Sequence, residues 1–94
     1  MLITGEIDIM IGGTLNQDFD FITGADTMDG AIRVYVSELN EKDRGTLKRE
    51  ITHFLSLSDE EITKEFRERY PNEFAPEDGK GLLEEVLKAI AENK

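Results

Sequence analysis

The chain contains no cysteine, only one histidine and only two prolines. Without cysteine, disulfides and thiolate zinc sites are excluded, and nothing indicates an oxidising compartment. No run of about 20 apolar residues is present, so no segment reads as a membrane span. The stretch from Met1 to Gly13 also lacks the basic start of a signal peptide. We therefore expect a soluble, cytoplasmic protein.

Basic residues are missing from the whole first third of the chain. The net charge is −10, from 21 acids against 11 bases, and the first base is Arg33. Such an acidic chain is repelled by nucleic acid and by anionic membranes, whereas it attracts a basic partner. The alternative is that the acidity only keeps the domain soluble. The acids that precede Arg33 are Glu6, Asp8, Asp18, Asp20, Asp26 and Asp29.

The 94 residues suit one domain, residues 1–94, because domains usually hold about 100–150 residues. Apolar residues recur at helical spacing over most of the chain, which predicts an all-α fold. We expect a small single-domain bundle of four to five helices. Residues 3–12 fit a strand or a helix, and we prefer a short helix. The other expected helices cover residues 26–39, 40–55, 58–70 and 82–93.

Capping residues mark where several of these helices begin. Ser58 and Glu61 match the capping box, Asn40 precedes another helix, and Asp26 or Thr27 precedes a third. Thr4 suits the N-cap of the first. Residues 71–81 contain both prolines and two glycines and are expected to form a loop, with Phe74 tucked inward.

Each expected helix has one apolar face and one polar face. In the helix that follows Asn40, we expect Lys48, Arg49 and Glu50 on the solvent side. The residues expected in the core are Ile3, Ile7, Met10, Ile11, Met28, Ile32, Tyr35, Val36, Leu39, Leu47, Ile51, Phe54, Leu55, Ile62, Phe66, Tyr70, Leu82, Leu83, Val86, Leu87 and Ile90.

Catalytic groups are scarce. A nucleophilic triad needs a nucleophile, a base and an orienting group, and the one histidine, His53, reads as a surface or boundary residue. The glycines at 12–13 and 79–81 fit no phosphate-binding loop. A calcium loop starting at Asp18 fails at its sixth position, where Thr23 replaces glycine. We expect no enzyme activity, no cofactor and no metal.

The stretch from Asn16 to Phe21 is a loop by composition that carries apolar rings. We expect Phe19 and Phe21 to anchor it on the core. Asp18 is interpreted as accepting backbone amides in the turns, so that replacing it with alanine mainly costs stability. For Asp20 and the aspartates after it, capping and partner contact both remain open.

The same stretch carries a resemblance to a known family. Residues 13–24 resemble the "hQDfD…G" signature of immunity proteins from contact-dependent growth inhibition (CDI) systems, and the likeness runs from about Ile11 to Ile90. Thr14-Leu15 and Val86 stand where the family often has aromatic residues. The signature residues here are Gly13, Asn16, Gln17, Asp18, Phe19, Asp20 and Gly24.

The resemblance implies a helical cytoplasmic protein that neutralises the toxic domain of its own partner, often a nuclease, in a one-to-one complex. A nuclease must be basic to bind phosphates, so an acidic inhibitor can bind it without chemistry of its own. The alternatives are an acidic adaptor for another basic protein, or a calcium-binding domain. No nucleic acid, membrane or small-molecule substrate is expected.

Two surfaces are predicted to contact the toxin, and one motif is predicted to be structural. The first surface comprises Asp20, Asp26 and Asp29, and the second comprises Glu73, Glu77 and Asp78. The structural motif comprises Gln17, Asp18, Phe19 and Phe21.

Overall fold

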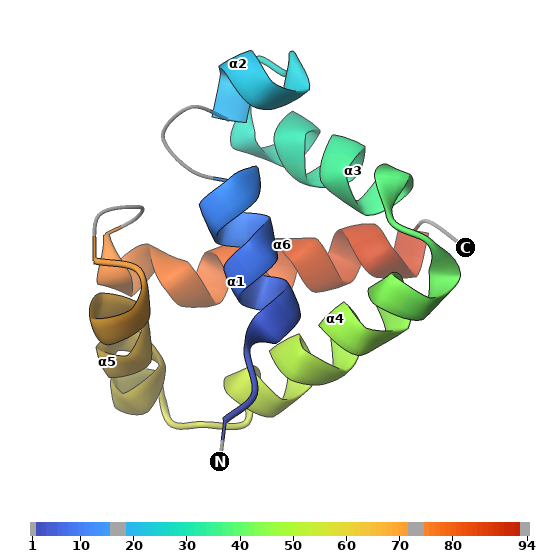
Figure 1. The fold of residues 1–94 in the computed structure, drawn as a ribbon. Coiled ribbons are helices and arrows are strands. Elements are labelled where there is room, and N and C mark those ends of the chain that lie inside the picture. Colours follow the sequence, from blue (N-terminus) through green and yellow to red (C-terminus); the bar gives the residue numbers. More distant parts are fainter. Residues whose placement is uncertain (1, 16–18, 72–74, 93–94) are drawn as a thin grey trace.

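The computed structural model describes residues 2–15, 19–71 and 75–92, and over these ranges the chain is helical, with no strand. The all-α prediction is confirmed, but the structure has six α-helices where four to five were expected, since Phe19–Thr23 forms a short helix in place of the predicted loop (Figure 1). The elements are α1 (Gly5–Gly13), α2 (Phe19–Thr23), α3 (Met28–Glu38), α4 (Glu41–Leu55), α5 (Asp59–Arg69), a 3₁₀ turn η1 (Pro76–Asp78) and α6 (Gly79–Glu92).

The C-terminal helix is the centre of the bundle. α6 packs against α3, α4 and α5, while α1 packs against α4 and crosses in front of α6 (Figure 1). α2 packs against α3 at one corner of the molecule. The N-terminal third of the chain therefore forms one side of the bundle, with α2 at its edge.

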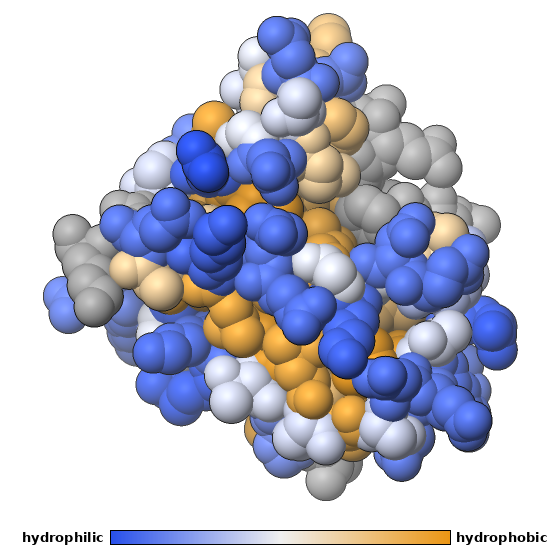
Figure 2. Space-filling view, turned by 180° about the vertical axis from the view of Figure 1, so that it is seen from behind, coloured by the Kyte–Doolittle hydropathy of each residue, from blue (hydrophilic) through white to orange (hydrophobic). Residues whose placement is uncertain are grey.

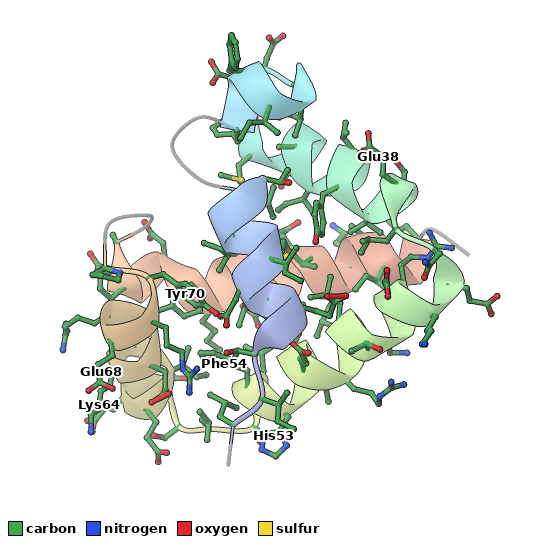
Figure 3. All side chains as sticks on the ribbon, in the orientation of Figure 1. Glu38, His53, Phe54, Lys64, Glu68 and Tyr70 are labelled. Carbon is green, nitrogen blue, oxygen red and sulfur yellow. The ribbon has the colours of Figure 1, made fainter. Side chains whose placement is uncertain are left out.

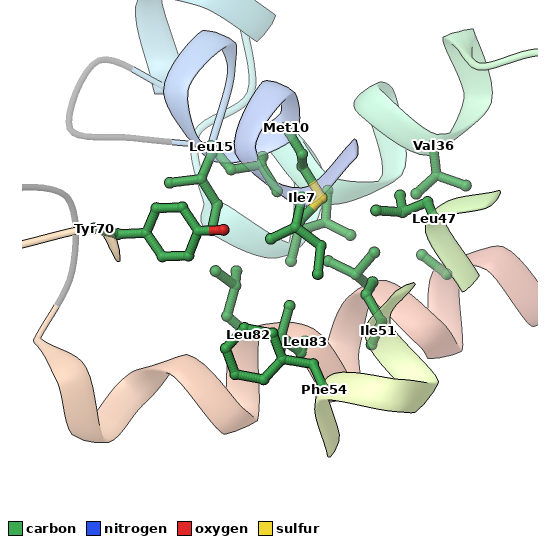
Figure 4. Close-up of a cluster of buried hydrophobic side chains, with 14 of the residues drawn as sticks. Ile7, Met10, Leu15, Val36, Leu47, Ile51, Phe54, Tyr70, Leu82 and Leu83 are labelled. Carbon is green, nitrogen blue, oxygen red and sulfur yellow. The ribbon is translucent and has the colours of Figure 1, made fainter. Parts of the chain in front are cut away.

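The core draws on every long helix (Figure 4). The rings of Phe54, Phe66 and Tyr70 form a chain of tilted contacts, with centroids 5.5 Å and 5.1 Å apart. Of the residues predicted for the core, Ile3 is wrong: it precedes α1 and is 67% exposed. The buried apolar residues are Ile7, Met10, Ile11, Leu15, Ala31, Ile32, Val36, Leu47, Ile51, Phe54, Ile62, Phe66, Tyr70, Leu82, Leu83, Val86 and Ala89.

The helix starts follow the predicted caps in three cases. The Asn40 side chain accepts a hydrogen bond from the Asp43 amide at 2.7 Å, and Thr27, not Asp26, caps α3. The Ser58 hydroxyl accepts from the Glu61 amide at 3.2 Å and donates to the Glu61 carboxylate. Each cap joins residues three positions apart, which is why the order of residue types along the chain predicts it.

The start of α1 departs from the prediction. Thr4 is at the N-cap position, but its side chain caps nothing and instead accepts a hydrogen bond from Arg69 Nη1 at 2.9 Å. The free amides of α1 donate to Glu50 of α4: Oε1 lies 2.9 Å from the Glu6 nitrogen and 3.1 Å from the Ile7 nitrogen. Placing Glu50 on the solvent side was therefore wrong, since only 8% of it is exposed.

The predicted loop 71–81 is shorter than expected, because α6 already begins at Gly79. Gly79 is buried against the ring of Phe66, and a Cβ added at Gly79 would lie 2.5 Å from that ring. Glycine is needed here because the start of α6 approaches α5 closely. The predicted inward position of Phe74 lies outside the described residues.

Candidate functional site

The corner formed by α2 and α3 is held by short-range hydrogen bonds. The Thr23 hydroxyl donates to the Phe19 carbonyl at 2.7 Å and accepts from the Ala25 amide at 3.1 Å, which closes the end of α2. Gly24 follows with φ of +77°, a conformation that glycine adopts at little cost. The chain then turns directly into α3. The two helices therefore form a defined corner of the fold.

The first predicted surface lies on this corner. Asp20 is on α2, Asp26 is in the turn, and Asp29 is in the first turn of α3; all three are exposed. The Asp20 carboxylate accepts a hydrogen bond from the Phe21 amide at 2.9 Å. The fold thus brings the three aspartates onto one corner, made of two helices that pack together and the turn between them. They remain free to face a partner, because none of them is buried.

The two phenylalanines of the corner behave differently. Phe19 is half-buried and packs against the core, as predicted. Phe21 is 91% exposed, so its predicted anchoring role is wrong. The reason is helical geometry: residues two apart on a helix point about 200° apart, since each residue turns about 100°. A loop or strand could have turned both rings inward, but α2 cannot. Gln17 and Asp18, the rest of the motif, lie outside the described residues.

The second predicted surface is elsewhere on the molecule. Glu77 and Asp78 are exposed on η1, which packs against α5 and α6 and not against the α2–α3 corner (Figure 1). Glu73 lies outside the described residues. The two predicted surfaces are therefore separate patches carried by different elements.

A third region contains the histidine and one arginine, Arg49. His53 is exposed at the end of α4 and points away from the core (Figure 3). It lines a shallow cavity of about 270 Å³ together with Ile3, Thr46, Arg49 and Glu50. Because the Glu50 carboxylate is engaged by the amides of α1, it is not available to orient the imidazole. The cavity thus combines one apolar side chain, Ile3, with polar and charged groups, and these do not form a catalytic pair.

Carboxylates gather where α1, α3 and α4 meet. Burial, followed by the charges of Asp43 and Glu50, raises the pKa of the Glu6 carboxyl. Burial, followed by the charges of Glu6 and Asp43, raises the pKa of Tyr35. This concentration of negative charge is offset in part by the amides at the start of α1, which favour an anion. The region has a structural explanation in the capping of α1.

Tyr70 joins two helices that are far apart in the sequence, α5 and α1. Its hydroxyl donates a 2.6 Å hydrogen bond to the Asp8 carboxylate, which ties the end of α5 to α1. Burial, followed by this hydrogen bond, raises the pKa of Tyr70 well above the usual tyrosine value. Figure 3 shows the side chain directed toward α1. Tyr70 therefore has a structural function, and its ring belongs to the core.

The described ranges, residues 2–15, 19–71 and 75–92, contain neither a metal-binding cluster nor a membrane-spanning helix. No group of three or more acidic or histidine side chains there is arranged to hold a metal ion. Among the same residues, no helix is long and apolar enough to cross a membrane.

Comparison with known protein families gives a match over most of the chain. The family model described as "CdiI immunity protein" matches residues 4–93. No curated protein and no solved structure matches the chain. The family match covers nearly the whole chain, including all six helices.

Proposed function

The chain belongs to the CdiI immunity protein family, whose members neutralise a toxin, and we propose that it does so by binding a basic toxin domain, a nuclease, through the acidic α2–α3 corner. The binding is one-to-one and takes place in the cytoplasm. It needs no metal, cofactor or chemistry on the part of the inhibitor. The toxin is inactive because the complex excludes its substrate.

The observation that carries this proposal is the distribution of charge. The net charge is −10, and residues 1–32 hold six acids and no base. The corner presents Asp20, Asp26 and Asp29 to solvent from two packed helices and the turn that joins them. A nuclease carries basic residues that contact phosphates. Opposite charges on the two proteins accelerate their encounter and fix their orientation.

The direct experiment uses the cognate toxin domain, which we expect the neighbouring gene to encode. The purified chain is expected to inhibit that domain stoichiometrically, and the affinity is expected to fall as ionic strength rises. Salt acts in this way because the Debye length shrinks from about 30 Å at 0.01 M to about 3 Å at 1 M. Inhibition that is insensitive to salt would refute the electrostatic mechanism. Absence of any binding, together with tight binding to another basic protein, would favour an adaptor function.

A charge-reversal pair locates the surface. Asp26→Lys with Asp29→Lys is expected to slow association and to flatten the salt dependence, because rim charges act mainly on the association rate. The control, Glu68→Lys with Glu85→Lys, makes the same change in net charge on exposed positions of α5 and α6. Equal slowing by both pairs would mean that only net charge matters. If neither pair slows association, the second patch, with Glu77 and Asp78, becomes the site to test.

A further inference from the structure

One aromatic ring stands out in the described part of the chain. Phe21 is 91% exposed, whereas the other aromatic residues that the structure describes are buried or half-buried. Ile22, next to it on α2, is 47% exposed. A large apolar side chain left in water forgoes the stabilisation that its burial would give. Nothing in the fold of the described residues requires a ring at this position.

The ring is presented on a fixed support. Phe19, at the start of α2, packs on the core, and Thr23 closes the other end with its two hydrogen bonds. Asp20 accepts a hydrogen bond from the Phe21 amide at 2.9 Å. A side chain held on an ordered backbone loses less entropy on binding than one on a floppy loop. Phe21 is thus suited to act as a contact residue.

The surroundings of the ring carry charge of one sign. Asp20 precedes Phe21 on α2, Asp26 lies in the turn that follows, and Asp29 lies on α3, which packs against α2. In Figure 2, the lobe of α2 and the start of α3 at the top of the molecule carries apolar and hydrophilic atoms side by side. A second copy of this chain would bring like charges together, which disfavours self-association through this corner. A basic partner would meet both the ring and the acids favourably.

We propose that Phe21, with Ile22 beside it, is the apolar anchor of toxin binding, and that it enters a pocket on the toxin rimmed by lysine or arginine. This inference rests on the proposed function and adds the chemistry of the contact. Anchors of this kind are aromatic, lie in desolvated pockets and are surrounded by polar groups.

The ring and the acids are expected to act on different rate constants. Removing a buried anchor mainly raises the dissociation rate, whereas removing rim charges mainly lowers the association rate and weakens its salt dependence. The two contributions can therefore be separated within one set of kinetic measurements.

The experiment compares Phe21→Ala with Ile9→Ala. Surface plasmon resonance measures how each variant binds the toxin domain expected from the neighbouring gene, at several salt concentrations. Ile9 is a matched control because it is 62% exposed on a different helix, α1. We expect Phe21→Ala to weaken binding at least about tenfold, through faster dissociation, with an unchanged salt slope. Ile9→Ala is expected to bind as the wild type does, and both variants are expected to melt as the wild type does.

The outcomes separate this inference from the proposed function. A wild-type chain that does not bind the toxin overturns both. If the wild type and Phe21→Ala bind equally well, only the anchor is overturned, and the same holds if Ile9→Ala weakens binding as much. Analytical ultracentrifugation tests the remaining alternative. If the wild type forms a dimer and Phe21→Ala does not, Phe21 contacts a second copy of this chain, and the inference that it anchors the toxin is overturned.

Discussion

The contact between Glu50 and the start of α1 joins residues far apart in the sequence, and its removal is expected to lower the free energy of unfolding. Glu50 Oε1 accepts from the amides of Glu6 and Ile7 at 2.9 Å and 3.1 Å, and Oε2 accepts a longer bond of 3.2 Å from Glu6. Only 8% of Glu50 is exposed. Replacing Glu50 with alanine leaves the backbone amides of Glu6 and Ile7 without their acceptor. Ile7 is a buried residue, so water does not replace the lost acceptor easily.

The size of the effect can be worked out from these contacts. A hydrogen bond to a charged group contributes about 1.5–3 kcal/mol, and an unsatisfied buried donor costs about 1–3 kcal/mol. Removing Glu50 also relieves its repulsion of Glu6, whose pKa it helps to raise. We therefore expect Glu50→Ala to lower the free energy of unfolding by about 2–4 kcal/mol. That is a large part of the roughly 5–15 kcal/mol that stabilises a domain.

The assay is urea unfolding at neutral pH, followed by far-UV circular dichroism. Glu50→Gln keeps one oxygen acceptor without the charge and is expected to lose about half as much stability. The matched control is Lys48→Ala, an exposed position on the same helix, which is expected to change stability by less than about 0.5 kcal/mol. If Glu50→Ala proves as stable as Lys48→Ala, the capping of α1 by this carboxylate is refuted.

Two further predictions concern the packing of α5 against its neighbours. Gly79→Ala places a Cβ against the ring of Phe66 and is expected to cost about 1–3 kcal/mol. In Gly81→Ala the added Cβ meets no atom within 4 Å, so this change is expected to raise the free energy of unfolding by up to about 1 kcal/mol. Equal effects of the two changes on thermal melting would contradict the close approach of Gly79 to Phe66. Tyr70→Phe removes the hydrogen bond to Asp8 and is expected to cost about 1 kcal/mol at neutral pH. Folding raises the pKa of Tyr70 above the ordinary tyrosine value of about 10. The protonated hydroxyl therefore contributes fully to the free energy of unfolding below about pH 10, and this contribution is lost as the pH rises further. Melts between neutral pH and pH 11 should therefore show a smaller alkaline loss for Tyr70→Phe, and parallel curves would contradict this.

The features that the sequence predicts well are local ones. The caps at Asn40 and Ser58 lie three residues from the amides they bind, and the apolar faces of α3 to α6 follow helical spacing. The signature stretch also pointed to the family, which the match over residues 4–93 confirms. Such signals depend on neighbours along the chain, so composition and spacing carry them.

The features that were missed depend on distant residues or on a helix of five residues. Glu50 reaches amides 43 and 44 positions away, and Gly79 faces Phe66 of another helix. The spacing could have placed Glu50 correctly, since it follows Leu47 by three residues and precedes Phe54 by four, all on one helical face. A loop at residues 16–21 would allow both phenylalanine rings to face the core, whereas the helix α2 places Phe19 inside and Phe21 outside.

We propose above all that this immunity protein binds its toxin through the α2–α3 corner. The most direct measurement is amide hydrogen exchange of the chain, free and in complex with the adjacent-gene toxin domain, read by mass spectrometry. We predict that complex formation slows exchange in peptides covering residues 19–33 and leaves exchange in η1 and on the exposed face of α4 unchanged. Protection confined to η1 or to α4, with residues 19–33 exchanging as in the free protein, would contradict it.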